Sequence, residues 1–325
     1  AEGLREFILV KDCVLVMGHQ IADADSLGAS IGIYRAATEL GKRAHIIINE
    51  ITSSVRPLYD EIAKNSSYPK DIFITSEEVK DYLTENTMVV VVDTNKPGMT
   101  ECPKLLDKAK TVAVLDHHRQ SSNMIENAVL SYIEPYSSSV CEMVAEVLQY
   151  IVEDIKLTPV EAECLYAGIM IDTRNFMNRT GVRTFEAAAY LRKKGVDPVG
   201  VRKLFRNDIS MYIQKSKIIS NAKVYRDNIA IAICDEPTKN VSIVVAQAAD
   251  DLLNINGVEA AFVLAQVGTR VIISGRSLGA INVQLILEVL GGGGHSTIAG
   301  AQLENNSLSI AELRLHNAID EVLFE

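Results

Sequence analysis

Short, fully apolar segments that each stop at a carboxylate constrain this sequence more than any other feature. Residues 88–92 are one methionine and four valines, and Asp93 follows them directly. Residues 112–115 are also apolar and lead into Asp116. Short continuous apolar runs separated by helical patterns are typical of parallel strands that are buried on both faces. The sequence therefore predicts an α/β fold in which helices cover a parallel sheet.

The other predicted elements divide the chain into three parts. In the first part we predict further strands at 13–17 and 45–48, and helices at 26–40, 139–152, 160–172 and 184–194. A charged helical pattern then runs over 199–225 and indicates a connector. Beyond it we predict strands at 229–234, 260–266 and 270–274, and helices at 242–253, 282–290 and 309–323. The predicted parts are a first domain at 1–195, a helical connector at 196–225 and a smaller α/β domain at 226–325.

Residues with the chemistry of metal ligands lie between these elements. His19, Asp23 and Asp25 belong to the segment Gly-His-Gln-Ile-Ala-Asp-Ala-Asp at 18–25, which is a predicted strand-to-helix loop. By itself, this segment is equally compatible with a polar loop that ends in a helix N-cap. Asp93 by itself is compatible with an ordinary strand-end carboxylate that caps a turn.

Two further segments make a metal site the better explanation. Asp116, His117 and His118 follow another apolar run, and Asp172 ends the apolar helical run at 165–171. Ligands that follow parallel strands meet at one edge of the sheet. Four aspartates in one pocket cannot all stay ionised without cations, so we predict two divalent ions. Mixed imidazole and carboxylate ligands favour Mn²⁺, with Mg²⁺, Co²⁺ and Zn²⁺ as alternatives. The predicted metal ligands are His19, Asp23, Asp25, Asp93, His117 and Asp172.

Composition limits the class of substrate and the compartment. The formal net charge is −10, which opposes binding of long nucleic acids because that binding relies on many Lys and Arg contacts to phosphates. A phosphate-bearing substrate is therefore expected to be small. Five scattered cysteines without a CxxC pair indicate reduced thiols. No apolar run reaches the roughly eighteen residues of a membrane helix. The start has no signal-peptide pattern and no initiator Met, and we expect the chain to be cut from something longer.

The four motif segments resemble those of one protein superfamily. Gly-His-Gln-Ile-Ala-Asp-Ala-Asp, Val-Val-Val-Val-Asp-Thr, Leu-Asp-His-His and Gly-Ile-Met-Ile-Asp-Thr are similar to the motifs of the DHH phosphoesterases. The glycine-rich segment at 291–300 resembles the signature of their DHHA1 subgroup. Within that subgroup, residues 276–302 are most similar to cyclic-di-AMP phosphodiesterases, whose full-length forms carry membrane helices, a PAS domain and a degenerate diguanylate-cyclase-like domain. The resemblance implies a parallel-sheet DHH catalytic domain, a helical connector and a DHHA1 substrate-binding domain. It also implies that the active site lies in a cleft between the two domains.

The resemblance also implies a role for each motif residue. His19 and Asp23 match ligands of a first metal, and Asp93 matches the carboxylate that bridges the two metals. The ligands of the second metal are matched by Asp25, His117 and Asp172. Asp116 matches a position that orients the histidines, and His118 matches a residue that contacts the substrate phosphate. The predicted catalytic residues are His118, Asp116 and Asp93.

Substrate contacts are predicted in the second domain. Consecutive glycines let the backbone approach a ligand and turn its N–H groups toward an anion. A flexible loop between a helix and a strand explains the four glycines alone equally well. Arg276 suits a bidentate phosphate contact, although a solvated surface arginine is the alternative. The predicted substrate-binding residues are Gly292, Gly293, Gly294, His295, Arg276 and His118.

These expectations combine into one leading function. The chain is predicted to be a manganese-dependent phosphodiesterase that hydrolyses cyclic di-AMP to linear 5′-pApA by two-metal activation of water. The alternatives are a nanoRNase or pAp phosphatase that acts on short linear oligonucleotides, and, from another class, a non-catalytic nucleotide sensor. A RecJ-like exonuclease is disfavoured, because the chain is acidic and has no tryptophan to stack bases. An inorganic pyrophosphatase would share the N-terminal motifs but not the glycine-rich segment.

The expected partners follow from the resemblance, the net charge and the helical connector. The partner is a small cyclic or linear dinucleotide, with no long nucleic acid and no membrane contact by this segment. Inhibition by guanosine tetraphosphate is implied by the resemblance, and the connector helices offer a face for a homodimer. The segment is expected to be a cytoplasmic module of a full-length protein that is anchored in the bacterial cell membrane.

Overall fold

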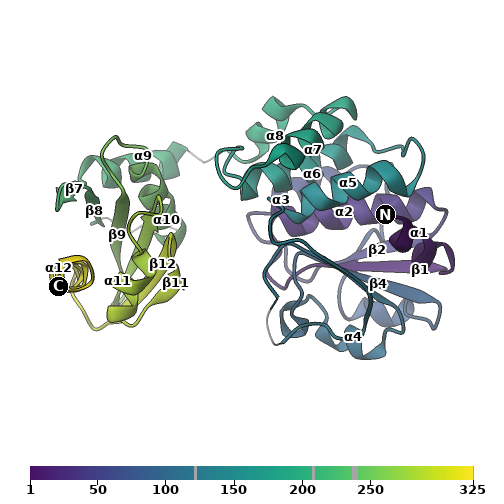
Figure 1. Cartoon of the computed structure of the whole chain (residues 1–325), viewed down its shortest axis with the longest axis horizontal. Coiled ribbons are helices and arrows are strands. Elements are labelled where there is room, and N and C mark those ends of the chain that lie inside the picture. Colours follow the sequence, from purple (N-terminus) through teal and green to yellow (C-terminus); the bar gives the residue numbers. More distant parts are fainter. Residues whose placement is uncertain (121–122, 207–208, 236–240, 325) are drawn as a thin grey trace. The chain divides into compact units, whose positions relative to one another are not determined.

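The structure, a computed structural model, describes residues 1–120, 123–206, 209–235 and 241–324. It divides into two compact units, Ala1–Arg206 and Asn207–Glu325. Each unit has a sheet and helices of its own (Figure 1). Within the described ranges, every helix falls short of the length and apolar character that a membrane crossing requires.

The first unit contains a parallel sheet of six strands in the order β3-β2-β1-β4-β5-β6. The strands are β1 (Cys13–Met17), β2 (Arg43–Ile47), β3 (Phe73–Ile74), β4 (Thr87–Val92), β5 (Val112–Asp116) and β6 (Ala128–Ile133). Every residue of β1, β4 and β5 is buried, as their continuous apolar sequences predict. The predicted parallel α/β sheet is confirmed. The sequence pattern did not reveal β6, because its residues alternate between half-buried and exposed.

Helices cover both faces of this sheet. They are α1 (Glu2–Leu9), α2 (Ala24–Glu39), α3 (Arg56–Ala63), α4 (Pro103–Lys108), α5 (Val140–Ile151), α6 (Pro159–Asp172), α7 (Val182–Lys193) and α8 (Pro198–Leu204), with short 3₁₀ turns at Glu78–Asp81 and Pro97–Met99. Val14 and Val16 of β1 pack into the core with α2, α5 and α6. Leu15 points to the opposite face, where α4 contributes Leu105. Figure 1 shows α2, α5 and α6 on one side of the sheet and α4 on the other.

The strand order reverses at β1, and this reversal determines where ligands can gather. From β1 the chain builds β2 and β3 outward on one side, and it then returns as β4 on the other side of β1. In open α/β sheets, a crevice forms at such a point beyond the carboxyl ends of the two strands. His19 lies just after β1 and Asp93 just after β4, so both flank this crevice.

The second unit has a mixed sheet in the order β11-β12-β10-β9-β8-β7. Its strands are β7 (Lys223–Tyr225), β8 (Ile229–Cys234), β9 (Ala260–Val267), β10 (Arg270–Ser277), β11 (Gly293–His295) and β12 (Ile298–Glu304). The pair β8–β9 is parallel and the other pairs are antiparallel. Its helices are α9 (Ile209–Ser220), α10 (Val241–Leu252), α11 (Val283–Val289) and α12 (Leu308–Phe324).

The second unit has one core on each face of its sheet. One core packs α11 and α12 against β9, β10 and β12, and the other packs α9 and α10 against β8 and β9. The predicted strands at 229–234 and 260–266 are present. The strand predicted at 270–274 continues to Ser277, so Arg276 lies within β10 rather than after it.

Candidate metal centre

The first group of metal-ligand side chains surrounds His19. Its Nε2 lies 3.3 Å from Asp93 Oδ2 and 3.6 Å from Asp23 Oδ2. Asp23 is also the N-cap of α2, because its Oδ1 accepts hydrogen bonds of 3.0 Å from the backbone amides of Asp25 and Ser26. The N-cap and metal-ligand interpretations of this loop are therefore compatible, since each uses a different oxygen of Asp23. The ligand atoms of His19, Asp23 and Asp93 lie within 4.8 Å of one another.

The second group consists of Asp25, His117 and Asp172. Their ligand atoms also lie within 4.8 Å of one another, and His117 Nε2 is 3.7 Å from Asp172 Oδ2. Asp25 is completely buried. Both of its oxygens accept backbone hydrogen bonds at the N-terminus of α5, from Val140 N at 2.7 Å and Cys141 N at 2.8 Å. A helix N-terminus stabilises a carboxylate through such N–H groups and its dipole.

Asp93 lies between the two groups. Its Oδ2 is directed at His19, whereas its Oδ1 is 3.6 Å from His117 Nε2. Asp93 adopts a left-handed backbone conformation with φ 60°, which costs energy for a residue other than glycine and is often found at functional sites. Its Oδ1 is buried and has no hydrogen-bond partner among the described residues. Burying such an oxygen is costly unless a cation or donor compensates for it.

The donor set fits a pair of divalent metal ions. Imidazole nitrogens and carboxylate oxygens are the ligands that Mn²⁺ and Zn²⁺ share in proteins. The two oxygens of Asp93 face the two ligand groups, and the buried Oδ1 is an acceptor that the protein itself leaves unsatisfied. The structure thus brings together all six residues that the sequence predicted as metal ligands.

The pKa values of this cluster reflect burial and crowding of charge. Burial raises the pKa of Asp172 to about 8, and the charges of Asp25 and Asp23 act in the same direction. Burial and the charge of Asp25 also raise the pKa of Asp93 well above its usual range. Burial acts to lower the pKa of His19, but its hydrogen bonds to the carboxylates of Asp23 and Asp93 outweigh burial and raise that pKa to about 10. Without cations, the cluster therefore retains protons.

Asp116 and His118 form a pair beside this cluster. Asp116 Oδ1 lies 2.8 Å from His118 Nδ1, and His118 keeps 60% of its side chain exposed. The resemblance predicted that Asp116 orients the histidines. The structure shows this contact for His118, whereas Nδ1 of His117 is 3.3 Å from the carbonyl oxygen of Ser137. The sequence analysis missed Asn95, whose Nδ2 donates a 2.6 Å hydrogen bond to Asp116 Oδ2. The sequence feature that could have indicated Asn95 is its position two residues after Asp93.

The glycine-rich segment of the second unit is part of the sheet. Residues 293–295 form β11 and pair with β12. Gly294 has φ 148°, and a Cβ on Gly292 would lie 2.3 Å from the carbonyl oxygen of Gly300. A side chain at Gly292 is therefore excluded by the close packing of the two backbones, which is a structural reason for glycine there. His295 is exposed.

Arg276 is held by neighbouring groups in β10 and α10. Its Nε donates a 3.1 Å hydrogen bond to Asp250 Oδ1, and its Nη1 donates to Ser274 Oγ at 3.0 Å and to the Gly275 carbonyl at 2.9 Å. Arg183 binds Glu146 through both Nε and Nη2. Its guanidinium is therefore engaged by a carboxylate of its own unit.

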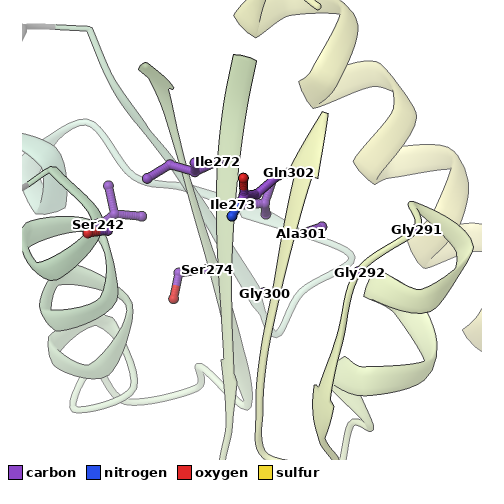
Figure 2. Close-up of a pocket in the computed structure, with 10 residues that line it drawn as sticks. Ser242, Ile272, Ile273, Ser274, Gly291, Gly292, Gly300, Ala301 and Gln302 are labelled. Atoms are coloured by element: carbon purple, nitrogen blue, oxygen red, sulfur yellow. The ribbon is translucent and has the colours of Figure 1, made fainter. Parts of the chain in front are cut away.

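A cavity of about 520 Å³ opens beside the middle of β10 and β12 in the second unit. Ile272 and Ser274 of β10, together with Gly300 and Gln302 of β12, contribute to its lining, and Ser242 lies on the α10 side (Figure 2). Of the predicted substrate-binding residues, Gly292 lines this cavity. The volume is in the range of small-molecule sites.

Comparison with known proteins finds two matching family models and several similar sequences. A model of the DHH family, N-terminal domain, matches residues 13–169, and a model of the DHHA1 domain matches residues 227–323. The cyclic-di-AMP phosphodiesterase GdpP of Bacillus subtilis is 43% identical over 99% of this chain and 49% of its own length. The cyclic-di-AMP phosphodiesterase PdeA of Listeria monocytogenes is 40% identical over 98% of this chain and 49% of its own length. The chain thus spans about half the length of these curated relatives.

A solved structure supports the fold. An exopolyphosphatase-related protein from Bacteroides fragilis matches with a TM-score of 0.78, covering 99% of this chain and 96% of that protein. Its sequence identity is 21%, so the match bears on the fold alone.

Proposed function

Because the chain belongs to the DHH phosphoesterase superfamily and carries a DHHA1 domain, we propose that it hydrolyses cyclic di-AMP to linear 5′-pApA with the help of two Mn²⁺ ions. The observation that carries the proposal is the position of Asp93, whose two oxygens face His19 and His117. The substrate is proposed from the two relatives with 43% and 40% identity, both cyclic-di-AMP phosphodiesterases.

The chain's own residues would perform distinct tasks. His19 and Asp23 would hold one ion, while Asp25, His117 and Asp172 would hold the other, with Asp93 shared between them. Bound divalent ions would lower the pKa of water at the site. They would also place positive charge next to the reacting phosphate. The four aspartates would in turn offset the charge of the ions, so that the site stays close to neutral.

His118 is suited to a contact with the substrate. Asp116 holds its Nδ1, and the ring is 60% exposed, so Nε2 is available for a ligand. In the protonated ring, Nε2–H would donate to a phosphate oxygen, and the Asp116 carboxylate would stabilise the ring's positive charge. Asn95, bonded to the other oxygen of Asp116, keeps that carboxylate oriented.

In the second unit, Arg276, Gly292, Gly293, Gly294 and His295 are proposed to bind the nucleotide. Arg276 would contribute charge to a phosphate, and the glycines would let the backbone approach the ligand closely. The cavity beside β10 and β12 provides room for part of a nucleotide. From family resemblance we also propose inhibition by guanosine tetraphosphate and a place within a longer membrane-anchored protein. A homodimer is proposed through the helices of the connector.

A turnover assay across substrates tests the proposal. Purified protein with Mn²⁺ would be incubated separately with cyclic di-AMP, pApA and pAp, and the products identified by chromatography and mass spectrometry. Cyclic di-AMP should be consumed fastest and should yield pApA. Faster turnover of pApA or pAp would favour the nanoRNase alternative instead. Tight binding of cyclic di-AMP without turnover would favour a sensor.

A further inference from the structure

Glu142 is a buried carboxylate close to the metal-ligand cluster but not part of it. It lies in the first turn of α5 and its side chain is 2% exposed. Its Oε1 accepts a 3.0 Å hydrogen bond from Ser137 Oγ. Its Oε2 accepts from the Thr184 hydroxyl at 2.6 Å and from the Ser138 hydroxyl. Three hydroxyl groups thus converge on one carboxylate.

These contacts differ from those that the local sequence favours. In Ser139-x-x-Glu142, a capping box would return the glutamate to the backbone N–H of the N-cap residue. Ser139 does cap the helix, since its Oγ accepts from Glu142 N at 3.1 Å. The glutamate instead reaches one residue further back, to Ser138 N at 3.4 Å. Its side chain therefore fixes the segment that leads into α5.

Glu142 is not primarily one half of an ion pair. The nearest cationic atom recorded beside it is Arg183 Nε, at 4.0 Å from Oε1. Arg183 makes much shorter contacts with Glu146, at 2.6 and 2.7 Å. Burial of a carboxylate costs free energy unless it is well satisfied, and here hydroxyl groups rather than a cation satisfy it.

The segment that Glu142 holds contacts two of the metal-ligand residues. At one end, the Ser137 carbonyl oxygen lies 3.3 Å from His117 Nδ1. At the other end, the amides of Val140 and Cys141 donate to the two oxygens of Asp25. One short segment therefore sets the ring orientation of His117 and the position of the Asp25 carboxylate.

We propose that Glu142 is a positioning residue of the metal centre. Acting through residues 137–141, it holds His117 and Asp25 in the arrangement that binds the second cation. Groups that orient metal ligands typically change metal affinity by 10- to 100-fold when removed. The inference rests on the proposed function only in requiring that the cluster binds a divalent cation. It does not depend on which phosphodiester is hydrolysed.

This role is tested by titrating the metal-free protein with Mn²⁺. Binding is measured by calorimetry and by electron paramagnetic resonance of the free ion. Glu142→Gln keeps the size of the side chain but replaces one carboxylate oxygen, which accepts hydrogen bonds from hydroxyl groups, with an amide NH₂ group, which can only donate. It should weaken binding of the second Mn²⁺ by roughly tenfold or more, and high Mn²⁺ should restore most of the turnover. A folded Glu142→Gln protein whose two Mn²⁺ affinities stay within about twofold of wild type would overturn the proposal.

Glu161→Gln is the matched control. Glu161 is also a fully buried glutamate in the first turn of a helix, α6, where it completes a capping box and pairs with Arg35 at 2.7 Å. Asp172 lies eleven residues further along the same helix, so the two are about 16 Å apart along its axis. Glu161→Gln should lower the melting temperature without changing Mn²⁺ affinity. An equal loss of Mn²⁺ affinity in this control would mean that any buried glutamate has the same effect, and would also overturn the proposal.

Milder variants keep the test decisive if Glu142→Gln does not fold. Ser138→Ala and Thr184→Val each remove one hydroxyl that donates to Glu142, and each should weaken Mn²⁺ binding in the same direction. Wild-type Mn²⁺ affinity in both would reject the positioning role. Wild-type protein that binds two Mn²⁺ ions but does not cleave cyclic di-AMP would reject the proposed function and leave this inference standing.

Discussion

A Cβ atom on Gly168 would lie 2.9 Å from the Cα atom of Asp25. The helices α2 and α6, which carry Asp25 and Asp172, therefore touch backbone to backbone at this point. Gly28 marks a second close approach one turn along α2, because its Cβ would be 2.5 Å from the carbonyl oxygen of Cys164. The distance between two predicted metal ligands thus depends on the absence of side chains at these glycines.

Gly168→Ala should force α2 and α6 apart. Overpacking of this kind costs about 1–3 kcal/mol. We expect a lower melting temperature and weaker Mn²⁺ binding, measured by thermal unfolding with and without Mn²⁺ and by calorimetry. Gly98→Ala is the control, since a Cβ there would meet no atom within 4 Å. Unchanged Mn²⁺ affinity in Gly168→Ala would show that the ligand geometry tolerates the separation.

Asp93→Asn should abolish turnover while preserving the fold. The amide supplies only one oxygen, so it cannot serve both groups of ligands. Loss of a group that merely orients a metal ligand lowers metal affinity or activity by 10- to 100-fold. Loss of this shared ligand should therefore lower turnover by more than about 100-fold. Turnover with excess Mn²⁺ and the circular dichroism spectrum are the measurements. Retention of a tenth of wild-type turnover would contradict the proposed role of Asp93.

The stability of the metal-free protein should fall as the pH rises from 6 to 8. The pKa of Asp172 is raised to about 8, so its contribution is greatest below the ordinary value of 3.8 and is lost as the pH rises toward 8. The pKa of His19 is raised to about 10, so its contribution is present below 6.5 and is lost as the pH rises through 10. Both contributions to the free energy of unfolding decrease as the pH rises, because the folded state binds more protons than the unfolded state.

Thermal unfolding in EDTA at several pH values measures this effect. Asp172→Asn should show a shallower decline than wild type. A melting temperature that rises with pH in this window for the wild-type protein would contradict the raised pKa values.

Binding of Mn²⁺ near pH 7 should release protons. Cations displace the protons that Asp172 and His19 retain, so the apparent affinity should increase with pH. Calorimetry in two buffers of different ionisation enthalpy counts the protons released. Identical binding enthalpies in both buffers would show that the cluster is already deprotonated.

Arg276→Lys should raise the KM for cyclic di-AMP while leaving Mn²⁺ affinity unchanged. Lysine lacks the forked guanidinium, so it cannot contact Asp250, Ser274 and a phosphate together. Arg270→Lys, on the same strand and face, is the control, since Arg270 is exposed and bonds to Gln302. Steady-state kinetics at saturating Mn²⁺ measure both variants. Equal KM values for Arg276→Lys and wild type would remove Arg276 from the substrate site.

The sequence predicted elements well where burial alone dictates the residue types. Strands β1, β4 and β5 are continuous apolar runs because helices or loops cover both of their faces. Strand β12 was not recognised, because its inward positions are Ala299, Ala301 and Leu303, and small residues give a weak alternating signal. The six predicted metal ligands do meet, and the sequence could indicate this because His19, Asp93 and His117 follow the carboxyl ends of predicted parallel strands.

The supporting contacts were beyond what the sequence could predict. Asn95, Ser137 and Glu142 each contact a residue distant in the chain, namely Asp116, His117 and Thr184, and those partners are known only once the fold is known. The Ser-x-x-Glu pattern at 139–142 even favoured a local capping box over the actual contacts. Residue type and spacing indicate candidate ligands, whereas tertiary structure determines what orients them.

The pairing of β1 with β4 has a consequence for how the chain folds. Cys13 pairs with Thr87, so the two strands that flank the crevice join only after a long intervening segment has been closed. Contacts of such high contact order form slowly, and loop-closure entropy must be overcome before they contribute stability. His19 and Asp93 thus become neighbours only when these two strands pair. A complete set of ligands for the cations therefore exists only once β1 and β4 lie side by side.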